Sequence, residues 1–573
     1  MIRDRGVLFL SLVVAAVGLW LLFVDFNSST ILFTNDIAVS LAVAERVLAG
    51  EFPLLGPPSH VGGRHLGPVY YYYAALCVAL AGGKPLVTVY LFAVFKWLAL
   101  LCTAALLSFF MLRKNLTTGL LGIGVCLLSG YYMQIIRTPW HGNYMLIPGC
   151  AYIATLCLAM RYRWAALPLL ALTASLLVQS HFGTAPFVLG SFAVLAFYMY
   201  RNSECTPPEV PWVLNSRGVF WGISALAVLS WLPLLLYEVS YRSNLYKLFK
   251  VHLSDTHRVA GLLTTLEALF QVFKRFLFAD YPFAALSNVL GAWTAALFCI
   301  ALVALFCDYL MRSTRVVRYT WTAIGAGIAC LVAALTSVKP PVHHYYFHFV
   351  SIVPALIAGI AFSRSVQIVW PRKEIASLYQ RIWLWISRAL AVVFLLIFVE
   401  ASYHAIPLNF AYFSRKPVRD FHTLQHAEEV TNFIEQRRNV DQLVRVFTRG
   451  NGRERENAIY FLLGLEHYPF MQYAKSFREL NSFQRTRPQT VKLHAGINQR
   501  RARMKIVPSA RVPSQAFVIS CHPDPTKRMR NPGRRFSSRW VEGELLDLAN
   551  CTSCNSCTVR RATQATLANE RAK

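Results

Sequence analysis

The chain has 573 residues, of which 55% are hydrophobic and only 15% are charged, and its mean hydropathy is +0.42. Soluble domains carry about 25% charged residues, so this composition excludes an ordinary soluble enzyme, a disordered chain and a coiled coil. One membrane crossing needs about 20 apolar residues, and only many crossings account for so much apolar sequence. The sequence therefore predicts a polytopic membrane protein, and its net charge of +29 makes the placement of basic residues informative.

About eleven apolar segments are long enough to be spanning helices. They are residues 7–24, 86–111, 117–135, 144–160, 164–180, 184–200, 219–237, 286–311, 319–337, 348–364 and 383–400. The first follows Arg3 and Arg5, is too long for the core of a signal peptide and has no small-residue cleavage site after it. We therefore expect an uncleaved helix that begins in the cytoplasm.

Residues 68–81 decide the orientation of the later helices. The segment is short, its run of tyrosines is typical of a membrane interface, and Pro68 suits the first position of a helix. If it does not cross, every basic connection faces the cytoplasm, as the positive-inside rule requires. We therefore expect 68–81 to lie on the outer surface or dip into it. The basic connections contain Arg113 and Lys114, Arg161 and Arg163, Arg201 and Arg217, Arg312, Arg315 and Arg318, and Arg364, Arg372, Lys373 and Arg381.

This topology predicts an all-α polytopic fold with the N-terminus inside and the C-terminus outside. Residues 1–400 would form the multi-spanning domain, with a first external loop at 25–85, and residues 401–475 a small extracytoplasmic region. Residues 476–573 are arginine-dense and lack periodicity, which is typical of a mostly disordered tail. Such a tail could contact anionic lipid. It contains no recognisable nucleic-acid-binding module, so we expect no nucleic acid partner.

Two external segments have the pattern of amphipathic helices that lie in the membrane interface. In the first, the apolar residues Ile37, Leu41, Ala44 and Leu48 form one stripe, with Glu45 and Arg46 turned away from it. In the second, the stripe consists of Leu262, Leu266, Leu269, Phe273 and Leu277, with Glu267, Lys274 and Arg275 on the polar side. The second stripe fits equally well a helix that packs on the protein's own core.

Asp36 opens the first of these helices. A carboxylate just above the bilayer could remove a proton from an acceptor hydroxyl. Alternatively, Asp36 only stabilises the N-terminus of its helix through the helix dipole. The spacing of residues by itself leaves both interpretations open.

Three cations are candidates for binding a phosphate. Arg64 and His65 end the first external loop, where a guanidinium matches the oxygens of a lipid-linked phosphate, although ordinary headgroup contacts would also explain them. Lys96 lies within the span 86–111. A lone cation in a span is costly and favours an anionic partner, and the alternative is that its amine extends to the nearest interface.

Five external motifs follow one another on the same side of the membrane. They are Asn35–Asp36 with Ala49–Pro53 and His65–Tyr71, then Arg137–Asn143, then Gln179–His181, then Pro233–Glu238 with Asn244, and finally His344–Tyr346 before Pro354. In this order they resemble the external loops of GT-C glycosyltransferases, specifically the branch with protein O-mannosyltransferases and lipid A aminoarabinose transferases. The resemblance runs from about residue 1 to residue 415.

The resemblance implies an inverting glycosyltransferase of the cytoplasmic membrane with its active site on the extracytoplasmic side. It would pass a sugar from a polyprenyl phosphate to a lipid, glycan or protein hydroxyl. Asp36 would be the general base, and Arg64, His65 and Lys96 would bind the donor phosphate. The candidates for the acceptor cavity are His141, Asn143, Gln179, His181, Glu238, His344 and Tyr345, although polar groups at the ends of spans can also be plain interfacial residues.

The chain departs from the resembled family at two acidic positions. Ile37 follows Asp36 where many relatives have a second acid, and His141 and Asn143 occupy the second loop where some relatives have one. These departures leave dependence on a divalent metal open. His344 and His348 are one helical turn apart, and His343 is next to His344. Because no carboxylate is near them in the sequence, we predict no metal site there.

Three cysteines near the C-terminus, Cys551, Cys554 and Cys557, resemble half of a metal site. Only Cys521 is close enough in sequence to add a fourth thiolate, so we do not expect a zinc or iron–sulfur centre. Outside the cytoplasm these cysteines could form disulfides instead.

Two other classes of function compete with the transferase. A transporter or flippase of a lipid-linked sugar would concentrate polar groups near the middle of the membrane, often in two related halves. Here the charge near the middle of the spans is nearly confined to Lys96, and no internal repeat is visible. A non-catalytic membrane scaffold would not require ordered external motifs, so the enzyme is favoured.

Overall fold

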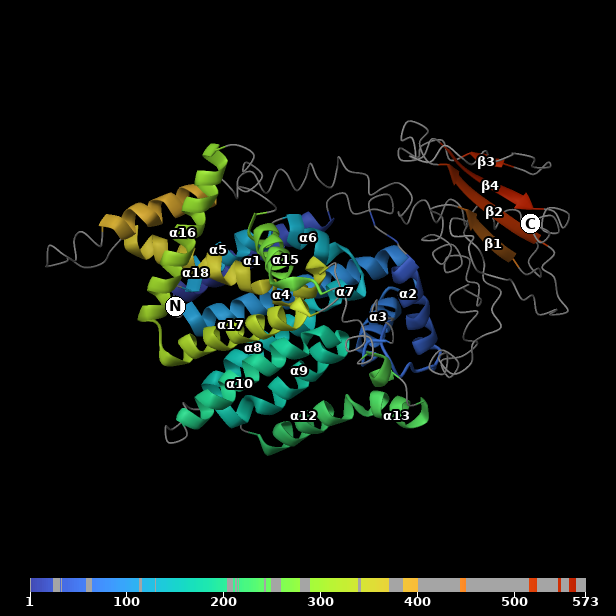
Figure 1. The fold of residues 1–573 in the computed structure, drawn as a ribbon, viewed down its shortest axis with the longest axis horizontal. Coiled ribbons are helices and arrows are strands. Elements are labelled where there is room, and N and C mark those ends of the chain that lie inside the picture. Colours follow the sequence, from blue (N-terminus) through green and yellow to red (C-terminus); the bar gives the residue numbers. More distant parts are fainter. Residues whose placement is uncertain are drawn as a thin grey trace. The chain divides into compact units, whose positions relative to one another are not determined.

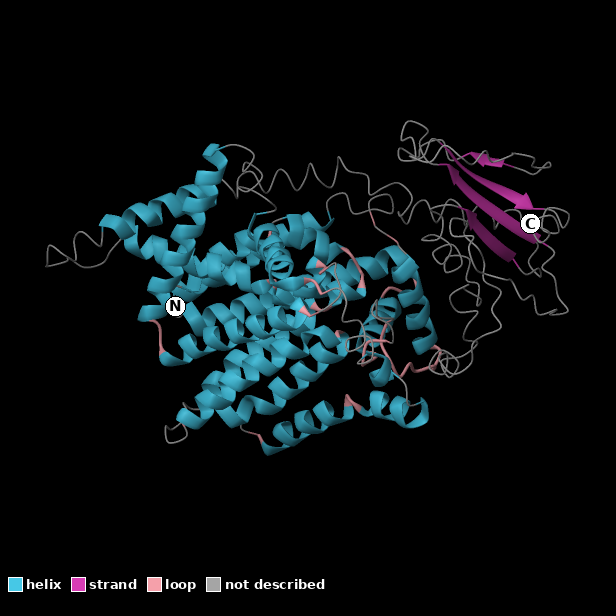
Figure 2. Ribbon diagram, in the orientation of Figure 1, coloured by secondary structure: helices cyan, strands magenta, loops and turns pink. Residues whose placement is uncertain are grey.

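The computed structural model describes two compact units. It describes residues 2–23, 31, 33, 35–57, 64–112, 116–128, 130–202, 210–211, 214, 216–241, 244–248, 259–278, 289–337, 342–369 and 385–399, and four strands between 444 and 562. The first unit comprises Met1–Val24, Leu54–Tyr70 and Val89–Tyr412, and the second comprises Asp25–Pro53, Tyr71–Thr88 and Phe413–Lys573. Helices account for nearly all of the described regular structure (Figures 1 and 2).

The N-terminal half of the described chain contains these helices: α1 (Ile2–Phe23), α2 (Asn35–Leu48), α3 (Val69–Leu80), α4 (Pro85–Leu112), α5 (Leu116–Leu127), α6 (Gly130–Arg137), α7 (His141–Tyr144), α8 (Leu146–Tyr162), η2 (Arg163–Ala166), α9 (Leu167–Ser180), η3 (Phe182–Thr184) and α10 (Ala185–Arg201). The following helices are α12 (Arg217–Leu229), α13 (Leu232–Tyr241), α15 (Gly261–Phe278), α16 (Val289–Arg312), α17 (Arg315–Thr336), η5 (His344–Val350) and α18 (Ile352–Val369).

Several of these helices are long and apolar enough to cross a membrane. By length and composition the described residues contain six such stretches: Pro85–Leu112, His141–Ser180, Phe182–Arg201, Arg217–Ser240, Arg315–Thr336 and Ile352–Val369. The prediction of an all-α polytopic membrane domain is therefore confirmed. The number of crossings, about eleven from the sequence, stays a prediction.

Backbone breaks divide three of the apolar stretches. Arg163, with φ +53°, turns the chain after α8, so His141–Ser180 contains the two segments that the sequence predicts there. The predicted span 117–135 is instead described as two helices, α5 and α6. The predicted span 219–237 is interrupted before Pro233, whose nitrogen cannot donate within a helix.

Close contacts between small residues hold the helices of the first unit together. The α5–α18 crossing depends on Gly122 and Gly359, because a Cβ at Gly122 would lie 3.0 Å from the Gly359 Cα. Hydroxyl pairs join α8 to its neighbours, with Thr155 Oγ1 2.7 Å from Thr173 Oγ1 and Tyr152 Oη 2.5 Å from Ser191 Oγ. Small residues and hydroxyl pairs are typical of helix packing in membranes, where burial of apolar side chains provides little driving force. Figure 1 shows α8, α9, α10 and α17 side by side.

Polar contacts also join the helix ends that are predicted to face the cytoplasm. Asp308 on α16 accepts a hydrogen bond from Arg312 Nε at 2.8 Å and pairs with Arg364 on α18. Arg315 on α17 donates to Asn202 Oδ1, just after α10, at 3.1 Å. These contacts connect two helix pairs, α16 with α18 and α17 with the end of α10.

The structure modifies the prediction for the two amphipathic helices. In α2, all residues from Ile37 to Ala44 are buried, not only those of the predicted stripe, whereas Leu48 of the stripe is exposed. In α15, Leu262 and Leu266 of the predicted stripe are exposed. The buried residues of α15 instead include Val272 and Phe276, towards its C-terminal end. That end packs on the protein itself, as the alternative interpretation of the second stripe proposed.

The second unit contains a four-stranded sheet that the sequence analysis does not predict. Its strands are β1 (Val444–Arg449), β2 (Gln515–His522), β3 (Leu545–Asp547) and β4 (Ser556–Ala562), in the order β1-β2-β4-β3. β1 is parallel to β2, and β4 is antiparallel to both β2 and β3. The register pairs Cys521 with Cys557. The sheet thus combines one strand from 401–475 with three from the predicted disordered tail, the rest of which lies outside the described residues together with Cys551 and Cys554.

Candidate functional site

In the first unit, backbone hydrogen bonds pair Gly56 and Pro57 with His65, near the end of the first external loop. Gly56 N–H donates to the His65 carbonyl at 3.0 Å, and His65 N–H donates to the Pro57 carbonyl at 2.9 Å. Arg64 is buried, and its Nε donates to the Gly56 carbonyl at 3.0 Å. The two candidate phosphate ligands therefore lie on a short, two-stranded turn rather than on a free loop.

A buried asparagine far along the chain fixes the same turn. Asn244 Oδ1 accepts a hydrogen bond from Arg64 N–H at 2.8 Å, and Asn244 Nδ2 donates to the Arg64 carbonyl at 3.0 Å. Both backbone groups of Arg64 are thus satisfied by one side chain that is itself fully buried. Asn244 belongs to a motif noted in the sequence, but its positioning role becomes visible only in the structure.

The turn continues into a close contact with the end of α9. Gly67 N–H donates to the Gln179 carbonyl at 3.2 Å, and a Cβ at Gly67 would lie 2.2 Å from Gln179 Oε1. Gln179 cannot easily move away, because its Nε2 donates to Ser230 Oγ at 2.9 Å. The glycine is therefore required by the packing of the turn against Gln179.

Lys96 lies on α4 and is completely buried. Its Nζ donates to the carbonyls of Ile135, at 3.0 Å, and Thr138, at 2.7 Å, which end α6 and begin the second external loop. A cation is favourable at the negative end of a helix dipole. Lys96 therefore has a structural role at this loop, and its role in phosphate binding stays a prediction.

The second external loop, Arg137–Asn143, is held at one further point, and a second buried cation lies at its start. Tyr70 Oη donates to the Pro139 carbonyl at 2.8 Å. Arg137, the last residue of α6, is buried within electrostatic reach of Tyr90. Two buried cations, Lys96 and Arg137, thus lie at the end of α6, just before the loop residues Trp140 and His141.

Aromatic and imidazole rings from four separate motifs meet in one group, which we call the ring cluster. It consists of Tyr70, Trp140, His141, His65, His181, His343, Tyr345 and Tyr346. The centroid of His65 is 4.8 Å from that of His181 and 5.5 Å from that of His141. Tyr345 lies 4.9 Å from Trp140, and Tyr346 lies 5.4 Å from His181. Residues as far apart in the sequence as His65 and Tyr346 therefore lie in one cluster.

The cluster presents neutral hydrogen-bond donors. His181 Nδ1 accepts a hydrogen bond from Gly183 N–H at 3.2 Å, so the neutral ring carries its proton on Nε2. Burial and the neighbouring Tyr346 raise the pKa of Tyr345 well above its ordinary value, so Tyr345 keeps its proton. Imidazole and phenol groups of this kind can bind phosphate oxygens or sugar hydroxyls.

Asn143 and His348 form a buried pair near the cluster. The distance between Asn143 Oδ1 and His348 Nδ1 is 3.0 Å, and the ring of His348 packs edge-to-face on Phe276 of α15. Within the part of the chain that is described, no three His, Cys, Asp or Glu side chains are placed to hold a metal ion.

The remaining candidates have different surroundings. Glu238, near the end of α13, accepts a hydrogen bond from Leu245 N–H at 2.9 Å through its Oε1, which fixes the segment that carries Asn244. The side chain of His344 lies outside the described residues. Asp36 is exposed in the first turn of α2, and its carbonyl accepts a hydrogen bond from Ser40 Oγ at 2.6 Å. Asp36 belongs to the second unit, and its role as general base stays a prediction.

The structure thus joins four of the sequence-based candidates in the ring cluster, namely His65, His141, His181 and Tyr345. Arg64 belongs to the same turn, and Gln179 is joined to it through the Gly67 N–H. The ring cluster also contains Tyr70, Trp140, His343 and Tyr346, which were not among the predicted site residues. All four lie within or beside the five external motifs named above. Their place in these motifs was the signal that could have identified them as site residues.

Two solved structures resemble this arrangement of helices over almost the whole chain. They are ArnT from Cupriavidus metallidurans bound to undecaprenyl phosphate, with a TM-score of 0.53, and the same protein in the apo state, with a TM-score of 0.52. In both comparisons 97% of this chain and 98% of the ArnT chain are covered, at 11% sequence identity. This chain has the GT-C fold. A scan against protein-family models and a search of curated proteins find no match.

The GT-C fold confirms the architecture that the five motifs imply. At 11% identity the comparison concerns the fold alone.

Proposed function

We propose that this protein is a membrane glycosyltransferase that uses a polyprenyl-phosphate sugar as donor and an extracytoplasmic hydroxyl as acceptor. The observation that carries the proposal is the ring cluster, which collects the predicted loop motifs at one place in a GT-C fold. The ArnT structure that resembles this chain contains undecaprenyl phosphate. A lipid phosphate of that class is therefore the donor carrier that we infer.

In the proposed reaction the acceptor oxygen attacks the anomeric carbon of the sugar from the face opposite the phosphate. The new C–O bond forms while the bond to the phosphate oxygen breaks, and the lipid phosphate leaves with the electron pair. Asp36 takes the proton of the acceptor hydroxyl. One displacement of this kind inverts the configuration at the anomeric carbon.

Groups at the turn and at α6 would stabilise the leaving phosphate. Arg64 and His65 are held in place by Gly56, Pro57 and Asn244, so little reorganisation is needed when negative charge develops. Lys96 adds positive charge at the second external loop, as does Arg137 beside it. Buried cations act strongly on an anion, because little water screens them.

The other rings would hold the transferred sugar and the acceptor. His141, His181 and Tyr345 supply hydrogen-bonding groups on aromatic surfaces, and Asn143 fixes His348 behind them. Gln179, Glu238 and His344 complete the predicted acceptor side. The identity of the sugar, and the choice among lipid, glycan and protein acceptors, are to be established by assay.

The decisive experiment is a transfer assay in proteoliposomes. Wild-type protein and Asp36→Asn would receive a panel of radiolabelled polyprenyl-phosphate sugars, with a membrane extract as the source of acceptor. Glu45→Gln is the matched control, because Glu45 is an exposed carboxylate on the same helix. Loss of a general base should reduce the rate about 100-fold or more, with unchanged thermal stability.

Three outcomes are informative. Transfer by wild type and by Glu45→Gln, but not by Asp36→Asn, would support the enzyme, the donor class and the base. Substantial transfer by Asp36→Asn would remove Asp36 from the role of base. Label that crosses the vesicle wall without reaching an acceptor would instead indicate a transporter of the lipid-linked sugar.

A further inference from the structure

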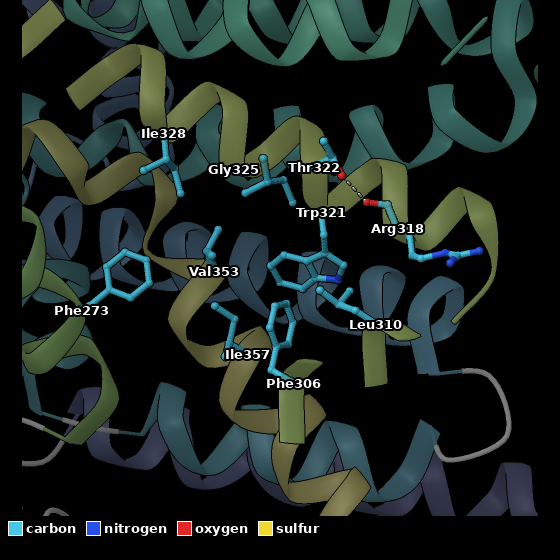
Figure 3. A pocket seen from close by; sticks show the side chains of 11 residues that line it. Phe273, Phe306, Leu310, Arg318, Trp321, Thr322, Gly325, Ile328, Val353 and Ile357 are labelled. Carbon is cyan, nitrogen blue, oxygen red and sulfur yellow. Dashed lines mark hydrogen bonds between the residues drawn. The ribbon is translucent and has the colours of Figure 1, made fainter. Parts of the chain in front are cut away.

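A groove lies among α15, α16, α17 and α18, away from the residues of the ring cluster. Its volume is about 450 Å³, and it is open on one side. Figure 3 shows Arg318 at one end, Phe273 at the opposite end and the indole of Trp321 between them. Apart from Arg318 and Thr322, the lining is apolar, including Phe306, Ile328 and Val353.

The length of the groove corresponds to one leaflet of a membrane. Arg318 and Ile328 are ten positions apart on α17, which is about 15 Å at a rise of about 1.5 Å per residue. The hydrocarbon core of a bilayer is about 30 Å thick, so one leaflet contributes about half of it. Because Arg318 is close to the basic turn between α16 and α17, the groove starts at that membrane surface.

At this end of the groove, Arg318 is available to a ligand. Arg312 pairs with Asp308, and Arg315 donates to Asn202. Arg318 is exposed, and with the described residues its guanidinium forms no hydrogen bond or ion pair. Its backbone N–H donates to the Thr314 carbonyl, and its carbonyl accepts a hydrogen bond from Thr322. A free guanidinium next to an apolar groove is complementary to an anionic headgroup with an attached acyl chain.

A second polar group points to the same ligand. Trp321 is 7% exposed, and its Nε1 has no hydrogen-bond acceptor among the described residues. A buried N–H without an acceptor costs about 1–3 kcal/mol. One helical turn separates Trp321 from Arg318, so a phosphate at the arginine would place ester oxygens near the indole.

We propose that this groove binds one anionic phospholipid from the leaflet on the basic side of the bundle. Its phosphate would lie at Arg318, an ester oxygen would accept the Trp321 N–H, and one acyl chain would fill the groove towards Ile328 and Phe273. No residue of this site belongs to the proposed donor or acceptor site. The two proposals therefore stand or fall independently.

Native mass spectrometry of the full chain tests the proposal. Protein in detergent would be titrated with phosphatidylglycerol or with phosphatidylcholine carrying the same acyl chains. We expect one phosphatidylglycerol to bind about five-fold more tightly than phosphatidylcholine, since one basic residue near an anionic group contributes about 1 kcal/mol. Arg318→Gln should abolish this preference, whereas Arg217→Gln, on the exposed first residue of α12, should retain it.

Filling the groove provides a second test. Gly325 lines it, and a Cβ at this position meets no atom within 4 Å, so Gly325→Leu occupies the groove without a clash of the Cβ. Gly222 on α12 is equally open and exposed, which makes Gly222→Leu the matched control. We expect Gly325→Leu to weaken phosphatidylglycerol binding at least about ten-fold, because it displaces several methylene groups from the groove, and Gly222→Leu to leave it unchanged.

Three results would overturn the proposal. Equal binding of both lipids by wild type would mean that the groove holds unselected membrane lipid. An equal effect of Gly222→Leu and Gly325→Leu would place the bound lipid elsewhere. Displacement of phosphatidylglycerol by equimolar polyprenyl phosphate would assign the groove to the donor lipid.

Discussion

Lys96 illustrates how a single charged side chain can be placed within a membrane helix. Its ammonium is buried and donates to two carbonyls at the end of α6. The sequence predicted an anionic partner or an extension of the amine to the interface. The structure adds a third arrangement, in which carbonyls with no helical partner of their own accept the hydrogen bonds. The position of the second external loop therefore depends on Lys96, whether or not a phosphate also binds there.

Replacement of Lys96 should destabilise the protein before any substrate is added. Lys96→Met leaves two buried carbonyls without their donor, and hydrogen bonds to charged groups contribute about 1.5–3 kcal/mol each. We expect a fall in unfolding free energy of about 3 kcal/mol, measured by denaturation in detergent. Lys84→Met, at an exposed lysine before α4, is the control and should have little effect. Equal effects of the two changes would contradict the structural role.

Gly67 is the second residue whose role follows from a distance. Gly67→Ala would place a methyl group 2.2 Å from Gln179 Oε1, and Gln179 is held by Ser230. We expect a loss of about 1–3 kcal/mol of stability and lower transfer activity, because the turn with Arg64 and His65 would shift. Thermal unfolding and the transfer assay together measure this. Gly222→Ala, at an open position, should be neutral or slightly stabilising, and a similar loss there would argue against the packing explanation.

At the scale of elements, α15 combines two environments in one helix. Its hydrophobic periodicity is compatible both with a membrane surface and with a protein core, because both require one apolar face. The structure assigns these roles to different turns. Leu262, Leu263 and Leu266 are exposed, whereas Phe276 packs 4.6 Å from Tyr132 and 6.0 Å from His348, between ring centroids.

Two phenylalanines of α15 should therefore respond differently to truncation. Phe276→Ala removes a fully buried ring and should cost about 3–5 kcal/mol of unfolding free energy. Phe270 is 49% exposed, and Phe270→Ala should change stability by no more than about 0.5 kcal/mol. Denaturation of both variants in the same detergent makes the comparison. If Phe270→Ala were the more damaging change, α15 would be packed through its other face.

At the scale of the whole molecule, the basic residues predict the side of the membrane on which each loop lies. Lysine and arginine are retained on the cytoplasmic side during insertion. The α16–α17 turn is therefore expected inside, and the start of α15 outside. The reaction that we propose requires the start of α15 to lie outside, because the acceptor is extracytoplasmic.

Single cysteines with a membrane-impermeant maleimide test this orientation. Leu263→Cys and Met311→Cys replace strongly exposed side chains on α15 and α16. We expect Leu263→Cys to be labelled in intact cells and Met311→Cys only after the membrane is permeabilised. Wild-type protein, whose described cysteines are free, gives the background. The reverse pattern would invert the topology and would place the ring cluster on the cytoplasmic side.

Much of the fold could be predicted because apolar length is a local property. The apolar segments around α4, α10, α17 and α18 were identified from composition alone. The divisions between α5 and α6 and between α12 and α13 were missed, since an apolar run hides a break in backbone hydrogen bonding. Pro233, and the Ser129-Gly130 dipeptide at the start of α6, were the local signals of these breaks. The sheet was not predicted, because its strands pair over long separations within an arginine-dense sequence.

For the candidate site, the sequence by itself determined which loops carry polar residues, because the order of the motifs can be read along the chain. It also predicted, through the positive-inside rule, that these loops share one side of the membrane. Only the tertiary structure decided that His65, His141, His181 and Tyr345 meet, and that Asn244 holds Arg64. The physical reason is that helix packing sets these contacts. Interlocking side chains, small residues and buried hydrogen bonds between helices determine which helix ends lie together. The sequence of a single loop contains none of these contacts.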